Sequence, residues 1–591
     1  MIEFLTANMA PLMFASLIVV LLLGYPVAFA LAANGIVFGL IGIELGLLQP
    51  SLFQALPQRI WGVMSNDTLL AVPFFTFMGL ILERSGMAED LLDTIGQLFG
   101  AIRGGLAFAV IFVGALLAAT TGVVAASVIS MGLISLPIML RYGYDRRFAS
   151  GVIAASGTLA QIIPPSLVLI ILADQLGKSV GDMYAGAFVP GLTLAGLYAL
   201  YAAGIAIFKP SWAPALPLEA RTFREPNGSS GTSSLIVLVI IAVAVSVAFA
   251  KLHYAPDAPM DELLVVSTSV GVGVAFFAAV INHFFKLGLL SRIAERITFV
   301  LIPPLALIFL VLGTIFLGVA TPTEGGAMGA TGALAMALVR RRISLKLLKQ
   351  AMDSTAKLTS FVVFILVGAR VFSLSFYGVD GHIWVEHLLT GLPGGQLGFL
   401  IVVNLLVFVL AFFLDFFELA FIIVPLLGPV AAKLGIDLIW FGVLLGVNMQ
   451  TSFMHPPFGF ALFYLRSVAP AKDYVDKLSG LLTPKVTTGQ IYWGAVPFVI
   501  IQLIMVSLVI VFPGLVTSGL DKQKVFDTGT MRIEVPAEAP TLGSEPGKDG
   551  AAAQAGKEEA PSEQDEAEAA LRRAMGGDAA GAKAPENKKQ P

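Results

Sequence analysis

Long apolar runs dominate this sequence, and they constrain its fold more than any other feature. A helix needs about 20 predominantly apolar residues to cross the hydrocarbon core of a bilayer. Runs near that length lie at about 9–23, 26–48, 67–83, 147–173, 183–208, 233–251, 262–285, 298–318, 322–339, 359–377, 441–465 and 490–513. Only 13% of the 591 residues are charged, about half the share typical of a soluble chain. The sequence therefore predicts an all-α polytopic membrane protein, since helices satisfy their own backbone in lipid.

Two further apolar stretches, 105–139 and 396–432, are too long for one crossing. Polar or helix-breaking residues lie near the middle of each stretch: Thr120, Thr121 and Gly122 in the first, Asp415 and then Glu418 in the second. Each stretch is either two ordinary crossings joined by a tight turn or a re-entrant hairpin that returns to the side it entered from. Because lipid-exposed loops are not tolerated at membrane depth, such a hairpin must line a cavity within the protein.

The chain contains an internal repeat. Residues 142–167 align without a gap on residues 434–459, with matches of Gly143 to Gly435, Asp145 to Asp437, and Pro164-Pro165 to Pro456-Pro457. In both places a long apolar stretch precedes a G-x-D loop, and an apolar segment with a polar centre and a double proline follows it. The repeat predicts halves at 1–208 and 297–515, with hairpins at about 105–139 and 396–432 and broken helices at about 147–173 and 441–465.

Two regions fall outside this repeat. Residues 209–296 are predicted to form a polar loop followed by two inserted helices. Residues 516–591 are rich in Ala, Glu, Lys, Pro and Gly with few large apolar side chains, a composition typical of disorder. We assign this polar tail no role in transport.

The charges in the loops indicate how the halves are oriented. Five crossings and one hairpin in each half would invert the second half, and inverted repeats with paired broken helices are typical of secondary transporters. With the N-terminus outside, most basic loop residues fall on the cytoplasmic side, and the opposite loops before the tail hold little beyond Arg59, Lys178, Lys251 and Lys433. This asymmetry fits the positive-inside rule. It favours re-entrant hairpins, the first opening from the cytoplasm and the second from the outside.

Broken helices and hairpin tips are where ligands can bind at membrane depth. The N-terminal ends of half-helices attract carboxylates, whereas their C-terminal ends and freed carbonyls suit Na⁺. The predicted substrate-binding residues are Thr121, Gly122, Ser156, Gln161, Asn448 and His455. The predicted Na⁺ ligands are Thr120, Gly157, Thr158, Glu324, Asp415, Gln450, Thr451 and Ser452.

Several of these residues have a structural alternative. Ser and Thr in membrane helices usually bond a carbonyl of their own helix or join neighbouring helices. Glu324 could cap a half-helix as well as pair with a cation, and His455 could be a structural hydrogen-bonder as well as a proton carrier. Asp415 is ionisable at membrane depth, which by default indicates function. Asp145 and Asp437 follow Gly-x in loops and are typical of turns or helix caps.

No signature of an enzyme is present. The sequence has no H-E-x-x-H, Walker A or G-x-S-x-G motif, and it has no cysteine for disulfides, thiolate metal sites or nucleophiles. We therefore expect no enzymatic activity, no organic cofactor and no nucleic-acid partner. The lipid bilayer is the expected surrounding.

The ordered motifs resemble the large membrane subunit (M subunit) of tripartite ATP-independent periplasmic (TRAP) transporters. They are LLAVPFFTFMGLILERSGMAEDL, GYDRRFASGVIAASGTLAQIIPPSLVLI, DMYAGAFVPGL, TPTEGGAMGA, AFFLDFFELAFIIVPLL and GIDLIWFGVLLGVNMQTSFMHPPFGFALFYL, and the resemblance covers about 1–208 and 297–515. It implies uptake of a small organic acid across the bacterial inner membrane, coupled to a Na⁺ gradient and performed by an elevator motion. It also implies two partners, a periplasmic substrate-binding protein (P subunit) and a small four-helix membrane subunit (Q subunit).

The sequence departs from this family at three positions. The first hairpin tip reads TGVVAAS where the family has S-G-S, the second reads FLDFFE where the family has F-L-D-P, and MHPP replaces L-T-P-P. These changes add Glu418 and His455. The alternative function is a stand-alone Na⁺/carboxylate symporter of the related elevator type, which would need no binding protein.

Overall fold

The computed structural model describes residues 2–121, 124–221, 225, 229, 231–254, 260–476 and 480–520. Among these residues, eight helices are long and apolar enough to cross a membrane, or up to eleven if each of three bent helix pairs is one span. A two-stranded antiparallel sheet, β1 (Tyr474–Val475) with β2 (Leu482–Thr483), is the one sheet in the described part of the chain. The predicted all-α polytopic fold is confirmed. The prediction for the polar tail from residue 521 onward lies outside the described residues.

The first half of the chain ends with a long helix and contains two interrupted regions. Its elements are α1 (Ile2–Ala7), α2 (Met9–Leu22), α3 (Val27–Glu44), η1 (Pro50–Ala55), α4 (Leu56–Met64), η2 (Asp67–Leu70), α5 (Ala71–Arg84), α6 (Met87–Phe99), α7 (Gly105–Thr121), α8 (Val124–Arg141), α9 (Arg146–Thr158), η3 (Leu159–Gln161), α10 (Leu167–Leu176) and α11 (Val180–Phe208). Helices α7 and α8 occupy the first predicted hairpin, and α9 and α10 the first broken helix.

Two inserted helices follow, and the helices of the predicted second half come after them. The insertion holds η4 (Pro210–Trp212), η5 (Leu218–Ala220), α12 (Thr232–His253) and α13 (Met260–Phe285). The second half holds α14 (Arg292–Phe316), α15 (Pro322–Val339), α16 (Leu345–Gly378), α17 (Gly381–Thr390), α18 (Gly395–Leu410), α19 (Phe416–Ile422), α20 (Val424–Lys433), α21 (Leu438–Met454), α22 (Phe460–Val468), α23 (Thr488–Val511) and α24 (Gly514–Thr517). The inversion of one half relative to the other stays a prediction.

The two G-x-D loops have the same physical basis. Gly143 and Gly435 have φ of +80° and +73°, a left-handed conformation that favours glycine and ends the preceding helix. The Asp145 carboxylate then accepts hydrogen bonds from the backbone N–H groups of Arg147 and Phe148 at 2.9 and 3.1 Å. Asp437 likewise accepts one from the backbone of Trp440 at 2.8 Å. Both aspartates are N-caps, which confirms the prediction that they cap helices.

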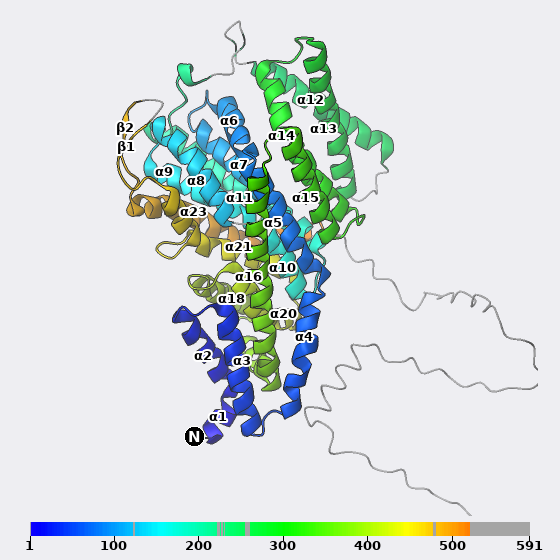
Figure 1. The fold of residues 1–591 in the computed structure, drawn as a ribbon, viewed down its shortest axis with the longest axis vertical. Helices are drawn as coiled ribbons and strands as arrows, with labels where there is room; N and C mark the ends of the chain where they lie inside the picture. Colours follow the sequence, from blue (N-terminus) through cyan, green and yellow to red (C-terminus); the bar gives the residue numbers. More distant parts are fainter. Residues whose placement is uncertain are drawn as a thin grey trace, which may run out of the picture.

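Helix α16 extends through the middle of the molecule, from the end that holds α12–α14 toward the end that holds α1 and α3 (Figure 1). It packs directly on α3 through glycines. A Cβ on Gly35 would lie 2.7 Å from the carbonyl oxygen of Val371, and one on Gly368 would lie 2.4 Å from that of Ala28. The Ser375 hydroxyl donates to the Gly35 carbonyl at 2.6 Å. Such close backbone approach through small residues is the usual way in which membrane helices associate.

Asp476 links the β1–β2 loop to the end of α8, and its loss is expected to destabilise the fold. Arg141 donates from Nε and Nη2 to the two carboxylate oxygens at 2.8 and 2.9 Å, and the Asp476 side chain is 5% exposed. Asp476→Ala would leave the arginine without this bidentate partner, so we expect a cost of about 2–3 kcal/mol. The measurement is the Tm of the purified protein. Lys472→Ala, at an exposed position just before β1, is the control, and equal Tm values for both variants would contradict the expectation.

Candidate functional site

Each half contains a helix that breaks at its double proline. Helix α9 and η3 end at Gln161, the next residues include Pro164-Pro165, and α10 starts at Leu167. The Ser166 hydroxyl donates to the Gln161 carbonyl at 2.8 Å, and its oxygen accepts from the Val168 backbone at 3.2 Å. In the second half, α21 ends at Met454 and α22 starts at Phe460. Proline lacks an N–H and clashes with the preceding turn, so helical hydrogen bonding stops at both places.

The two broken helices meet through polar side chains. Gln450 on α21 donates from Nε2 to Oγ1 of Thr158 on α9 at 3.1 Å, and both side chains are fully buried. The Thr158 hydroxyl itself donates to the Ala155 carbonyl at 2.9 Å. Its oxygen can therefore only accept from neighbouring groups, which orients the Gln450 amide with its nitrogen toward Thr158. Two residues that the sequence predicts as Na⁺ ligands, one from each half, are thus in contact.

Two further residues of this cluster were missed by sequence reasoning. Gln502 on α23 donates from Nε2 to Tyr198 Oη on α11 at 2.8 Å, and to Thr158 Oγ1 at 3.5 Å. Both side chains are fully buried. The signal was present, because Gln502 is the one amide in the interior of the apolar run 490–513, whose first residue is Gln490. We call Thr158, Tyr198, Gln450 and Gln502 the buried amide cluster.

Four buried side-chain oxygens on α9, η3, α21 and α23 lack hydrogen-bond donors among the described residues. The amide oxygens of Gln161, Gln450 and Gln502 and the hydroxyl oxygen of Ser156 are buried without a hydrogen-bond partner among the described residues. Such atoms are rare, and each costs about 1–3 kcal/mol when left unsatisfied. The unpartnered atoms are all oxygens, which are the ligands that Na⁺ takes at broken helices of transporters. The donor set therefore fits a small cation.

The helices of the first predicted hairpin enclose α9 at this level. A Cβ on Gly114 of α7 would lie 2.5 Å from the Cβ of Ser156, and one on Gly157 would lie 2.4 Å from Cγ2 of Val128 on α8. Glycines at 114 and 157 thus let α7 and α8 contact both sides of α9. The predicted site residue Gly122 and the side chains of Thr120 and Thr121 lie outside the described part of the chain.

Three other predicted residues on α21 form hydrogen bonds with backbone carbonyls. Asn448 donates from Nδ2 to the Asn404 carbonyl on α18 at 2.7 Å, which ties α21 to the second hairpin. The hydroxyls of Thr451 and Ser452 each donate to carbonyls three residues earlier, at 2.6 Å in both cases. This is the structural alternative that applies to Ser and Thr in membrane helices. A ligand role for these residues stays a prediction.

The predicted acidic ligands sit in capping boxes. The Asp415 carboxylate accepts from the Glu418 backbone at 2.9 Å, and Glu418 Oε2 accepts from the Asp415 backbone at 2.8 Å, at the start of α19. Glu324 forms the same arrangement with Thr321 at the start of α15. Glu324 is exposed, and α15 packs mainly on α5 and α14. The structure thus does not bring Glu324 to the buried amide cluster.

His455 lies among aromatic rings at the second helix break. Its ring centroid is 5.4 Å from that of Phe408 and 4.8 Å from that of Phe412, both near the end of α18. The Phe458 ring is 6.1 Å from Phe412. Nδ1 of His455 is buried without a partner among the described residues, although the side chain as a whole is only partly buried. A polar nitrogen with bonding capacity therefore sits beside an aromatic surface.

Comparison with known families decides what kind of protein carries this site. The family model described as "Tripartite ATP-independent periplasmic transporter, DctM component" matches residues 14–515, which includes both broken helices and both hairpin regions. The chain belongs to the DctM family of TRAP transporters. The DctM-family match confirms the resemblance drawn from the motifs, and the chain is the large permease subunit of such a system.

Curated relatives of the chain are described as permeases of different TRAP transporters. The chain is 28% identical to the C4-dicarboxylate TRAP transporter large permease protein DctM of Pseudomonas aeruginosa, over 71% of this chain and 82% of that protein. It is also 28% identical to the protein of the same description in Vibrio cholerae, over 78% of this chain and 89% of that protein. A sialic acid TRAP transporter permease protein, SiaT of Haemophilus influenzae, is 22% identical over 85% of this chain and 66% of its own length.

Proposed function

We propose that this DctM-family chain imports a small organic acid across the bacterial inner membrane, driven by a Na⁺ gradient. In this proposal a periplasmic binding protein (P subunit) delivers the substrate, and a small four-helix membrane subunit (Q subunit) accompanies the chain. The relatives are described as transporters of C4-dicarboxylates, sialic acid and isethionate, which all carry an acid group. One of them is described as a DctMQ permease, of which this chain covers 62%, and this supports a second membrane component.

The observation that carries the Na⁺ proposal is the buried amide cluster. Gln450 and Gln502 both turn their amide nitrogens toward hydroxyl oxygens, so both amide oxygens face elsewhere without a donor. A bound Na⁺ would satisfy such oxygens and would hold α9, α21 and α23 together. Because these helices come from both halves, ion binding would couple the halves. We propose that this unit moves as one body against α3 and α16, which is the elevator motion.

The substrate carboxylate is proposed to bind at the second helix break. Helix α22 begins at Phe460 without a side-chain cap, so its first backbone N–H groups can bind an anion. The nearby His455 has an unpartnered Nδ1, which can donate to a carboxylate. The rings of Phe412 and Phe458 would contact the apolar part of the molecule. This location uses His455 in the role that the sequence predicts.

Reconstituted transport tests the proposal. Proteoliposomes with this chain and its small subunit, with binding protein outside, are expected to accumulate the acid that most stabilises that binding protein in a thermal-shift screen. Accumulation should require an inward Na⁺ gradient and should vanish when K⁺ replaces Na⁺. Equal accumulation without the binding protein would instead support the stand-alone symporter. Accumulation that persists without any Na⁺ gradient would contradict the ion coupling.

The proposed topology has its own test. Because the chain has no cysteine, an introduced cysteine is the one thiol that a reagent can label in it. Lys178→Cys and Lys349→Cys each place one thiol at an exposed position, the first on the periplasmic side and the second on the cytoplasmic side of the proposed topology. A membrane-impermeant maleimide added to intact cells is expected to label the first variant and not the second. Opening the cells should make both accessible. The reverse pattern in intact cells would contradict a periplasmic N-terminus.

A further inference from the structure

The two inserted helices create a groove that the transport proposal does not use. Helices α13, α14 and α15 enclose a space of about 690 Å³, with a lining that includes Gly273 and Phe276 of α13, Pro303 and Leu310 of α14, and Met336 of α15. Neighbouring α12 has only 6% of its most apolar stretch buried, as expected for a helix in contact with lipid. The groove therefore opens on the membrane.

A basic pocket lies at one end of these same helices. It has a volume of about 610 Å³, and its lining includes Arg292, Arg296, Arg342 and His283, together with Asp90 and Glu295. The pocket sits where α13 and α15 end and α14 begins, so it is at a surface of the bilayer. In the proposed topology this is the cytoplasmic surface.

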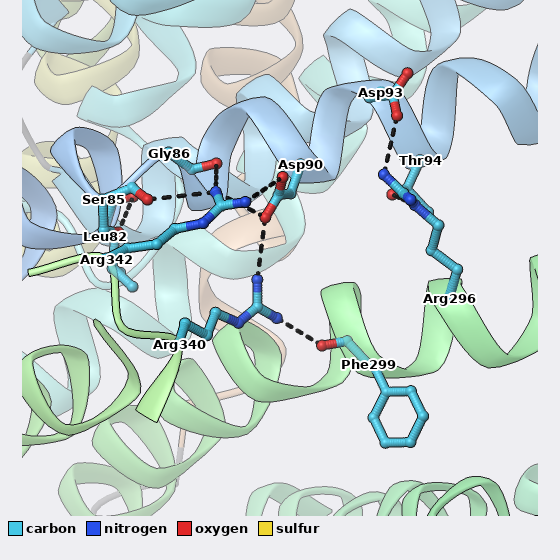
Figure 2. A network of polar contacts seen from close by, with 10 residues as sticks. All are labelled: Leu82, Ser85, Gly86, Asp90, Asp93, Thr94, Arg296, Phe299, Arg340 and Arg342. Atoms are coloured by element: carbon cyan, nitrogen blue, oxygen red, sulfur yellow. Dashed lines mark hydrogen bonds and ion pairs between the residues drawn. The ribbon is translucent and has the colours of Figure 1, made fainter. Parts of the chain in front are cut away.

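The acidic residues of this pocket are shared among several cations. Asp90 accepts from Arg340 at 3.3 Å and from Arg342 at 3.2 Å, and Arg296 pairs with Asp93 at 3.1 Å (Figure 2). His283 contacts Glu295 at 3.1 Å. These pairs fix the arginines in place, so their positive charge stays at this end of the helices.

Arg292 is the cation with the most capacity to bind a ligand. It is exposed, and its backbone N–H donates to Glu225 at 2.6 Å. Its guanidinium forms no hydrogen bond or ion pair with any described residue. The adjoining turns add the exposed Lys286 and Arg341, so positive charge exceeds negative charge around the opening.

The basic pocket and the apolar groove adjoin at a pair of aromatic rings. The ring of Phe299, in the pocket, lies 5.5 Å from that of His283 and 5.9 Å from that of Phe276 in the groove. On α14 the groove runs from Ile302 to Thr314, which at 1.5 Å per residue is about 18 Å. Half of a bilayer's hydrocarbon core is about 15 Å thick. The groove is thus long enough for the acyl chain of one lipid.

We propose that this surface binds a phospholipid with an anionic headgroup, its phosphate among the arginines and an acyl chain along α13 and α14. Arginine forms paired hydrogen bonds with phosphate oxygens, and basic residues at the bilayer surface attract anionic lipids. Free inorganic phosphate would use the same arginines but not the groove. The groove therefore distinguishes a lipid from a free anion, and the site is independent of the transported acid.

Two substitutions distinguish the contribution of the headgroup to lipid binding from that of the acyl chain. Arg292→Gln removes the uncommitted cation, and we expect phosphatidylglycerol to bind about fivefold more weakly. Gly273→Leu fills the groove, because a Cβ there meets no atom within 4 Å, and we expect at least a tenfold loss. Arg103→Gln, at another exposed loop arginine, and Gly204→Leu, at another glycine with no atom within 4 Å, are the matched controls.

The measurement is native mass spectrometry of the purified full chain, titrated with phosphatidylglycerol, phosphatidylcholine or inorganic phosphate. The proposal expects phosphatidylglycerol to bind more tightly than phosphatidylcholine, to be weakened by both test substitutions, and to be unaffected by both controls. If inorganic phosphate competed fully with the lipid and bound the Gly273→Leu variant as tightly as the wild type, that result would overturn the proposal in favour of a free anion site. Equal binding of the two lipids would also overturn it.

Discussion

Gly494→Leu is expected to prevent α23 from packing on α9 and to lower the yield of folded protein severely. A Cβ at position 494 would lie 2.0 Å from the carbonyl oxygen of Arg147, and one on the facing Gly151 would lie 2.1 Å from that of Gly494. Both obstacles are backbone atoms, so no side chain can rotate away. Overpacking typically costs about 1–3 kcal/mol, and this crossing is expected to exceed about 3 kcal/mol. Size-exclusion yield and Tm measure the effect.

Gly489→Leu is the matched control for this prediction. It lies in the first turn of the same helix, and a Cβ there meets no atom within 4 Å. The control should give wild-type yield and a Tm within a few degrees of wild type. If Gly494→Leu also behaved like wild type, α23 and α9 would not be in backbone contact. The position of Gln502 beside Thr158 would then be wrong as well.

Gln450→Met is expected to abolish most Na⁺-dependent uptake while leaving the protein folded. Methionine has nearly the same volume, but it removes the amide that donates to Thr158 and the unpartnered amide oxygen. An interaction between a charged group and a polar partner contributes about 2 kcal/mol. The Na⁺ concentration for half-maximal uptake should therefore rise roughly thirtyfold. The experiment is uptake by proteoliposomes over a Na⁺ titration.

The control for this variant is Gln396→Met. That side chain is exposed, and it donates to the Leu434 carbonyl at 2.7 Å. It lies at the start of α18 and is not part of the buried amide cluster. Its Na⁺ dependence should match that of the wild type. A Gln450→Met protein with unchanged Na⁺ dependence would remove Gln450 from the ion site. A drop in maximal uptake at an unchanged half-maximal Na⁺ concentration would indicate a structural role for Gln450 instead.

The sequence was most informative where local chemistry decides the backbone. The paired Gly143-x-Asp145 and Gly435-x-Asp437 loops were predicted as turns or caps, and the structure confirms the caps. The double prolines mark where helical bonding stops in both halves. Left-handed glycines, N-cap aspartates and missing N–H groups act within a few residues, so one sequence is enough to recognise them.

Tertiary contacts were less accessible from the sequence. Gln502 lies next to Thr158 because the glycine pair at 151 and 494 lets the backbones of α9 and α23 touch. No local sequence pattern predicts how these two helices are rotated relative to each other. The capping boxes at Asp415 and Glu324 are local patterns. For Glu324 the sequence predicted either a cap or a cation partner, and the structure shows the cap. For Asp415 it predicted an ion ligand, and the capping box with Glu418 was missed. An ionisable side chain at membrane depth indicates function by default, and that rule outweighed the local hydrogen-bonding pattern.

The central claim is that the buried amide cluster, built from one broken helix of each half, is the coupling-ion site. The most direct test is equilibrium binding of radioactive Na⁺ to the purified full chain, in wild type and in the Thr158→Val, Gln450→Met double variant. We expect the wild type to show saturable Na⁺ binding that excess unlabelled Na⁺ displaces and K⁺ does not. We expect the double variant to lose that binding while it still elutes as folded protein. Saturable Na⁺ binding of equal affinity in both proteins would contradict the claim.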